Sequence, residues 1–172
     1  KRLTVREFAW DSAERAVLAR DRAVLAFNAR PVAEELAGSA AEPDEAERRQ
    51  LELTNEYRRM LGRRALAFHP ALQAAAQDHS DYMARTGDFS HFEPAPESRG
   101  PVERMRLRGY LEGRGENCAM TGGPESAHEG WRHSSGHHRN LLGLEHRELG
   151  SAQAGNYWTQ NFGSGNDFEG GL

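Results

Sequence analysis

Residues 130–142 read GWRHSSGHHRNLL, and this stretch is the most informative part of the chain. It contains three of the eight histidines, one tryptophan and two serines. Gly136 argues against a continuous helix here, because glycine destabilises a helix by about 1 kcal/mol relative to alanine. Histidine exchanges a proton near neutral pH and binds metals. The stretch is therefore a candidate part of a functional site, and the question is which other residues would face that site with these histidines.

The composition of the whole chain narrows the class of protein. The 172 residues are 37% hydrophobic and carry a net charge of −4 at pH 7. That charge argues against nucleic acid as the main partner. We expect no transmembrane segment, because no stretch approaches the roughly 18 apolar residues that a spanning helix requires. The single cysteine, Cys118, excludes an internal disulfide, and no signal peptide is visible at Lys1.

The first 45 residues differ from the rest, since they are rich in Ala, Arg and Glu and contain no histidine. The sequence RAVLA occurs twice, seven residues apart, and predicts a helix with an apolar stripe formed by Val17, Leu18, Val24 and Leu25. We expect Pro31 to end this helix and Gly38 to end a second one, with GSAAEPD as a linker. The stripe predicts docking on the chain's own domain, and a partner-binding helix is the alternative.

Helical signals continue beyond the linker. Asp44 and Glu47 fit the capping pattern of a helix start. Apolar residues follow at helical spacing, namely Ala46, Leu53, Tyr57, Met60 and Leu61, and Gly62 predicts the end of this helix. Pro70 suits the first turn of a helix that ends near Gly87 and has the apolar stripe Leu72, Ala75, Ala76, His79 and Met83. Shorter helices are expected over 102–107 and 124–133.

Strands are expected late in the chain, over 117–120, 149–154 and 157–162. Gly155-Asn156 between the last two is a favourable two-residue hairpin turn. Helices followed by a small antiparallel sheet predict an α+β fold.

Several short motifs then occur in a fixed order. They are N-x-x-R-x-x-x-G at 55–62, FSH at 89–91, RMRLRGY at 104–110, GENCA at 115–119, W-x-x-S-x-G-H at 131–137 followed by NLL, and YWTQNFG at 157–163. Together they resemble the CAP superfamily of cysteine-rich secretory proteins, antigen five and pathogenesis-related proteins, in its bacterial SCP-like branch. The resemblance gives a CAP domain over 46–165, an N-terminal helical extension and linker over 1–45, and a flexible tail over 166–172.

The resemblance implies an α-β-α sandwich with a surface cleft, in a protein that is secreted or held in the cell envelope. Many members line this cleft with two histidines and two glutamates. By motif match His91, Glu116 and His137 are three of these four residues. Ser134 stands where animal members have the second glutamate. Some members bind sterols or other lipids in a neighbouring groove, so a lipid is one candidate partner.

Two imidazoles and a carboxylate are a suitable ligand set for Zn²⁺ or a similar divalent ion, with one position open to water. The alternative is a polar cleft in which Glu116 accepts hydrogen bonds and orients a histidine. A hydrolase would instead use Ser134 as nucleophile, a histidine as base and Glu116 as orienting group. Ser134 has no G-x-S-x-G context, and we expect it to cap the helical turn that begins near Gly136.

The remaining candidates are expected to be structural. Cys118 and His79 are expected in the core, and His133 and His138 on the surface. The aromatic residues expected to fill one side of the sandwich are Trp131, Tyr157, Trp158 and Phe162. We expect Asn117 or Gln160 to brace the cleft loops through paired amide hydrogen bonds.

Three hypotheses on function follow from these residues. The leading one is a binding module that presents the polar cleft to a ligand or a protein partner. The second is a hydrolase, with or without metal, that uses the same cleft. The third is a structural head that the N-terminal helices dock onto another protein.

Overall fold

The computed structural model describes residues 12–28 and 43–165. The expectations for Pro31, Gly38 and the tail over 166–172 lie outside these residues. The elements in the described part are α1 (Ser12–Asn28), α2 (Glu45–Met60), β1 (Ala67–Phe68), α3 (Pro70–Thr86), a 3₁₀ turn η1 (Pro96–Ser98), α4 (Pro101–Leu107), β2 (Gly113–Met120), α5 (Pro124–His133), α6 (Ser135–Leu141), β3 (Glu148–Ala154) and β4 (Tyr157–Gly163).

The strands form one four-stranded sheet in the order β1-β3-β4-β2. The β3–β4 and β2–β4 pairs are antiparallel, as expected, and the predicted hairpin turn is present, with Gly155 at φ +58°. The two-residue strand β1 adds a parallel edge that the sequence did not predict, because so short a strand carries no alternation of its own. The sheet is therefore mixed rather than purely antiparallel.

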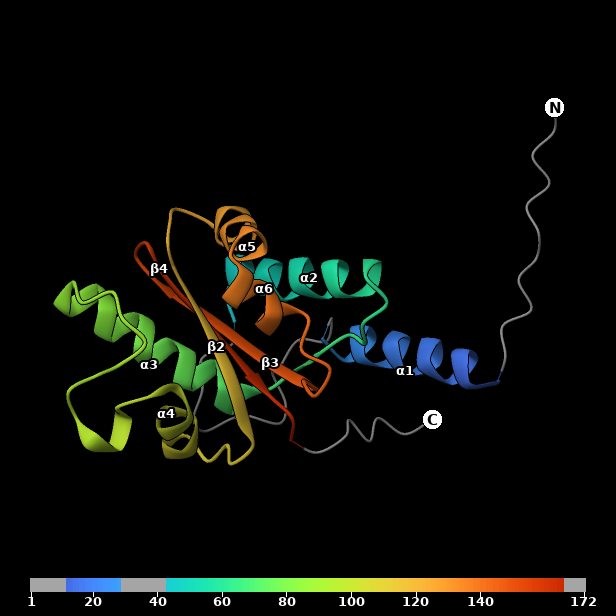
Figure 1. Ribbon diagram of the computed structural model, residues 1–172, viewed down its shortest axis with the longest axis horizontal. Helices are drawn as coiled ribbons and strands as arrows, with labels where there is room; N and C mark the ends of the chain where they lie inside the picture. The colour runs from blue at the N-terminus through green and yellow to red at the C-terminus, as the bar shows by residue number, and fades with distance from the viewer. Residues whose placement is uncertain (1–11, 29–42, 166–172) are drawn as a thin grey trace.

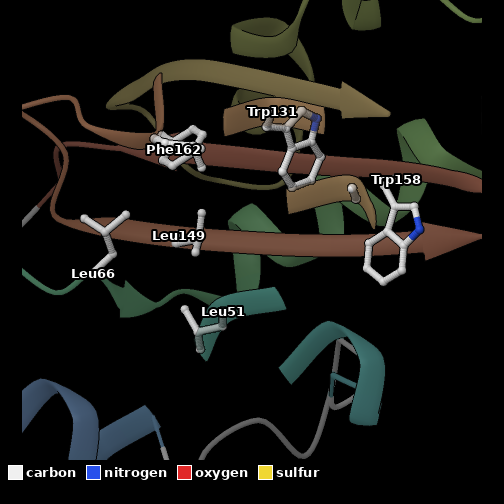
Figure 2. Close-up of a cluster of buried hydrophobic side chains, with 8 residues drawn as sticks. Leu51, Leu66, Trp131, Leu149, Trp158 and Phe162 are labelled. Atoms are coloured by element: carbon white, nitrogen blue, oxygen red, sulfur yellow. The ribbon is translucent and has the colours of Figure 1, made fainter. Parts of the chain in front are cut away.

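Helices cover both faces of this sheet, so the molecule is an α-β-α sandwich (Figure 1). Helices α2, α5 and α6 lie on one face, and α3 and α4 lie on the other. Figure 2 shows the larger core, under the first face, which contains Leu51, Leu66, Ala127, Trp131, Leu141, Leu149, Trp158 and Phe162. The smaller core under α3 and α4 contains Leu72, Ala75, Met105 and Tyr110.

The predicted helix boundaries within residues 43–165 are confirmed. Asp44 and Glu47 form a reciprocal capping box at the start of α2, with bonds of 2.8 and 3.0 Å. Helix α3 begins at Pro70 and ends at Gly87, which takes the left-handed conformation that glycine adopts without strain. The whole predicted apolar stripe of α3 is buried.

The predicted apolar face of α2 is wrong in part. Met60 and Leu61 are 80% and 47% exposed, whereas the buried face contains polar residues: Gln50, Thr54, Asn55 and Arg58. Asn55 shows why a polar residue can be buried on this face: its side chain accepts a hydrogen bond from the Leu66 N–H and donates one to the Leu66 carbonyl. A buried polar residue of this kind is tolerated because its hydrogen bonds are made.

Helix α1 packs beside β1, at the edge of the sheet. Val24 is fully buried against Ala65 and Ala67, and Leu25 packs on the same cluster. The Asp21 carboxylate accepts a hydrogen bond from the Ala65 N–H at 3.1 Å. Part of the predicted stripe, Val24 and Leu25, therefore contacts the chain's own sheet edge.

Candidate functional site

The candidate site lies along β2, the strand at the open edge of the sheet. Successive side chains of a strand point to opposite faces. Glu116 points to the α3–α4 layer, where Arg104 donates to it, and Asn117 points to the α5–α6 layer, where it bonds the His137 carbonyl. The edge strand thus lets residues from both helical layers meet at one place.

Glu116 is the centre of the site, and both of its carboxylate oxygens are occupied. His91 Nδ1 lies 2.8 Å from Oε1, and Arg104 Nη2 donates to Oε2 at 2.7 Å. The Glu116 side chain is 1% exposed, whereas that of His91 is 42% exposed. A buried carboxylate therefore holds a histidine whose ring reaches solvent.

The electrostatics keep Glu116 ionised. Burial alone would raise the pKa of its carboxyl, but the His91 hydrogen bond and the charges of Arg104 and His79 outweigh it and lower the pKa below the usual value. An ionised carboxylate only accepts hydrogen bonds, so we assign the proton of the bond to His91 Nδ1. The other ring nitrogen, Nε2, is then the one that can accept a ligand.

His137 comes to this place from α6. Its ring centroid lies 6.3 Å from that of His91, and burial, followed by the nearby His91, lowers the pKa of His137 below its usual value. Asn140, one turn further along α6, donates to the Glu116 carbonyl at 2.9 Å and to Asn117 Oδ1 at 3.0 Å. These bonds fix α6 against β2.

The Asn117 amide also donates to Gln160 Oε1 at 3.3 Å, and Gln160 donates to Thr54. The chain Thr54–Gln160–Asn117–Asn140 connects α2, β4, β2 and α6 beneath the site. Asn117 and Gln160 therefore make the paired amide bonds that were expected, and their role in bracing the cleft stays a prediction.

Close contact at Gly115 explains why β2 has so small a residue at this position. A Cβ added there would lie 3.1 Å from Asn140 Oδ1, which is tighter than ordinary contact. Glycine at this position therefore lets Asn140 approach the strand and bond it.

Neither candidate nucleophile has the setting of an activated one. The Cys118 sulfur lies 3.6 Å from His91 Nδ1, but burial, followed by the charge of Glu116, raises the pKa of this thiol well above its usual value. The thiol stays protonated, and a protonated thiol is a poor nucleophile. Ser134 is the N-cap of α6, as expected, although its side chain makes no capping bond there. Within residues 43–165, no histidine bonds the Ser134 hydroxyl.

A second grouping has distances that could hold a metal. One ligand atom each from His79, Glu116 and Cys118 lies within 4.8 Å of the others. Binding there would require His79 Nε2 to give up its bond to the Ser90 carbonyl, Cys118 to lose a firmly held proton, and Glu116 Oε1 to release His91. The polar atoms of His79 and Glu116 already have hydrogen-bond partners, and the Cys118 thiol is protonated, so this grouping does not fit a metal ion.

The other histidines and aromatic residues mostly take their predicted places. His133 is 74% exposed and pairs with Glu129, and His79 is fully buried. His138 differs, because it is half-buried and bonds the Tyr57 hydroxyl at 3.0 Å. Trp131, Trp158 and Phe162 fill the core, whereas Tyr157 is half-buried at the end of β4.

Three important residues of the site were not assigned a role from the sequence: Glu93, Arg104 and Asn140. Arg104 and Asn140 lie inside the RMRLRGY and NLL motifs, so their position in those motifs was the available signal. Glu93 lies two residues after FSH and had no signal, because nothing in the sequence places it beside His79.

A three-layer sandwich with a histidine–glutamate site at its edge strand defines the class of this protein. The model of the cysteine-rich secretory protein family (CAP) matches residues 51–162. The chain belongs to this family.

Relatives agree with this assignment. The chain is 32% identical over 120 residues to YkwD, an uncharacterized protein of Bacillus subtilis, and over 121 residues to the membrane protein YlbC of the same organism. The matches cover 67% and 68% of this chain and 46% and 34% of those proteins. The chain thus spans less than half of their length.

Two solved structures show the same fold. The first is an extracellular protein of Bacillus anthracis that contains an SCP domain, with a TM-score of 0.65, 26% identity, and coverage of 74% of this chain and 45% of that one. The second is an outer surface protein of Borrelia burgdorferi, with a TM-score of 0.63, 15% identity, and coverage of 75% and 99%. In the described part of this chain, no helix combines the length and apolarity needed to cross a membrane.

Proposed function

We propose that the protein is a CAP-domain binding module that acts outside the cytoplasm, and that His91 and His137 are the residues that contact its ligand. The observation that carries this proposal is the 2.8 Å contact between His91 Nδ1 and the buried Glu116, which orients the ring and leaves Nε2 for a ligand. His137 lies beside it on a different element.

This pair also suits a divalent ion such as Zn²⁺, which accepts neutral imidazole nitrogens. The lowered pKa of His137 supports this, because it favours the neutral form at neutral pH. Glu116 fits the role of the carboxylate behind a ligating histidine, a common arrangement at zinc sites. As a direct ligand it would have to bind the ion through an oxygen that already accepts from His91 or from Arg104. When bound, the ion would supply a Lewis-acidic coordination site for an oxygen or nitrogen of the ligand.

Calorimetric titration with Zn²⁺ tests this proposal. The wild-type protein should release or absorb heat on binding, and His91→Ala and His137→Ala should each abolish the signal while the far-ultraviolet circular dichroism spectrum stays unchanged. His133→Ala is the matched control, because His133 is exposed and bonded only to Glu129 in the described structure. Absence of heat in the wild type, or equal heat after His91→Ala, would overturn the metal site.

For the partner, we propose a protein, lipid or sterol rather than a nucleic acid. The net charge of −4 supports this choice. We place the protein in the secreted fraction or the cell envelope, which is supported by its similarity to an extracellular SCP-domain protein. Fractionation of cells that produce the full chain tests the location, and recovery in the cytoplasm alone would contradict it.

A further inference from the structure

Four ionisable side chains are packed together directly beneath His91. His79 comes from α3, Glu93 from the loop after α3, Arg104 from α4 and Glu116 from β2. Their side chains are 0%, 11%, 2% and 1% exposed. Groups so deeply buried must neutralise one another, because an uncompensated buried charge is very costly.

The contacts show how this neutralisation is achieved. His79 Nδ1 lies 2.8 Å from Glu93 Oε1, and its Nε2 lies 3.9 Å from Glu116 Oε1. Arg104 donates to Glu116 at 2.7 Å, and its Nε lies 3.7 Å from Glu93 Oε1. Each carboxylate thus has both cationic side chains within 4 Å.

The hydrogen bonds of His79 determine its protonation state. Its Nδ1 faces the Glu93 carboxylate, and its Nε2 faces the Ser90 carbonyl oxygen at 2.8 Å. Both partners can only accept hydrogen bonds, so both ring nitrogens must donate. His79 is therefore an imidazolium. The other groups that face it are the Tyr82 ring, stacked at 6.1 Å, and the protonated thiol of Cys118.

The same residues hold the backbone of the loop that carries His91. Arg104 donates to the carbonyl oxygens of His91, Ser98 and Arg99. His79 donates to the Ser90 carbonyl, one residue before His91. The loop is therefore held at His91, at the residue before it, and at the end that leads into α4.

We propose that His79, Glu93 and Arg104 are positioning residues for His91: with Glu116 they form a buried cluster of two cations and two anions that fixes both the His91 loop and the His91 ring. The cluster explains why a histidine on an apolar helix face, expected only as a core residue, lies under the site. This inference rests on the proposed function only for its zinc-binding readout.

The first test is the protonation state of the histidine rings, which is independent of any ligand. Long-range ¹H–¹⁵N spectra of the protein with ¹⁵N-labelled histidine should show both nitrogens of His79 protonated at neutral pH. His79→Gln and His91→Gln assign the signals. A singly protonated His79 in the wild type would overturn the proposal.

The second test removes one charge at a time. Glu93→Gln should leave His79 singly protonated, because one carboxylate can no longer balance two cations, whereas the exposed Glu97→Gln in the same loop should change nothing. Arg104→Met should move the His91 ring signals and weaken Zn²⁺ binding by about 10- to 100-fold, as the loss of a group behind a metal ligand does. Arg104→Lys should restore part of this loss.

Arg106→Met is the matched control on α4, because Arg106 is exposed. Wild-type zinc affinity and unmoved His91 signals in Arg104→Met would contradict the positioning role. If the wild type binds no zinc at all, the proposed metal site is wrong. The protonation state of His79 still tests whether the buried cluster contains two cations and two anions.

Discussion

Glu116 shows how a carboxylate can be buried with its polar atoms bonded. Its oxygens accept from His91 and Arg104, and its backbone carbonyl accepts from Asn140. Each donor comes from a different element, so the residue connects the His91 loop, α4 and α6 to the edge strand. Because its polar atoms are satisfied, burial does not drive the carboxyl to its neutral form.

Glu116→Gln is expected to lower the free energy of unfolding by about 3 to 5 kcal/mol, because the buried Arg104 loses the carboxylate that it hydrogen-bonds and only Glu93 remains to balance the buried cations. Urea denaturation at neutral pH measures this. The folded-state pKa of Glu116 lies below the ordinary 4.5, so its stabilisation is present above about that pH and is lost as the pH falls through the folded pKa. The difference between variant and wild type should therefore shrink in acid. The exposed Glu103→Gln is the control, and an equal loss there would contradict the role of burial.

At the residue scale, the sequence identified His91, Glu116 and His137 through their motifs, and the structure brings His91 and Glu116 into direct contact. The sequence alone could not identify Arg104 or Glu93 as partners of these residues. The strength of a charge pair depends on the distance between the two groups in space, which sequence separation does not reveal.

At the scale of helices and strands, local signals predicted boundaries well and buried faces less well. For helix α3 both the boundaries and the buried face were predicted correctly, because its apolar stripe has ordinary helical spacing. Helix α2 shows the failure, since its buried face carries Asn55 and Arg58. Arg58 donates to the carbonyls of Leu141 and Gly143 at the end of α6. Such long-range partners make a polar residue suitable for the interior, and no local pattern reports them.

The helix α1 lies outside the matched family region, and we propose that it is part of the folded unit of this chain. Val24→Ala should lower the free energy of unfolding by about 1 to 2 kcal/mol, because Val24 is buried against Ala65 and Ala67. Urea denaturation measures the loss. The exposed Arg22→Ala on the same helix is the control. No loss in Val24→Ala would favour the alternative of an independent partner-binding helix.

At the scale of the whole molecule, the site belongs to neither helical layer alone. The loop after α3 carries His91 on one side of the sheet, and α6 carries His137 on the other. They meet only because β2 is an edge strand whose alternating side chains reach both layers. Helix α6 must therefore pack on β2, and α4 on Glu116, before the two histidines are neighbours.

Two other buried histidines predict how the whole fold responds to acid. Burial, aided by the charges of Arg132 and Arg58 respectively, lowers the pKa of both His128 and His146 to about 4. In the unfolded chain the value is about 6.5, so the unfolded state binds protons that the native state does not. Stability is full above about pH 6.5 and is lost as the pH falls toward about 4, at up to about 1.4 kcal/mol per pH unit for each histidine.

Urea denaturation at about pH 7 and about pH 5 tests this expectation. Replacing both histidines with glutamine should make the fall in stability between these conditions smaller by about 2 to 4 kcal/mol. The exposed His133→Gln should keep the wild-type fall. An unchanged pH dependence in the double variant would show that these two side chains are not buried in the neutral form.

The amino-acid order alone was sufficient for the helix caps, the hairpin turn, the family and the choice of three candidate site residues. Caps and turns depend on neighbours within a few positions, and motifs are visible directly in the sequence. It was not sufficient for the parallel edge β1, the polar face of α2 or the cluster under His91. These depend on which distant groups become neighbours when β2 pairs with β4 and the two helical layers close over the sheet. Burial and charge compensation act between such neighbours, so only the folded chain decides them.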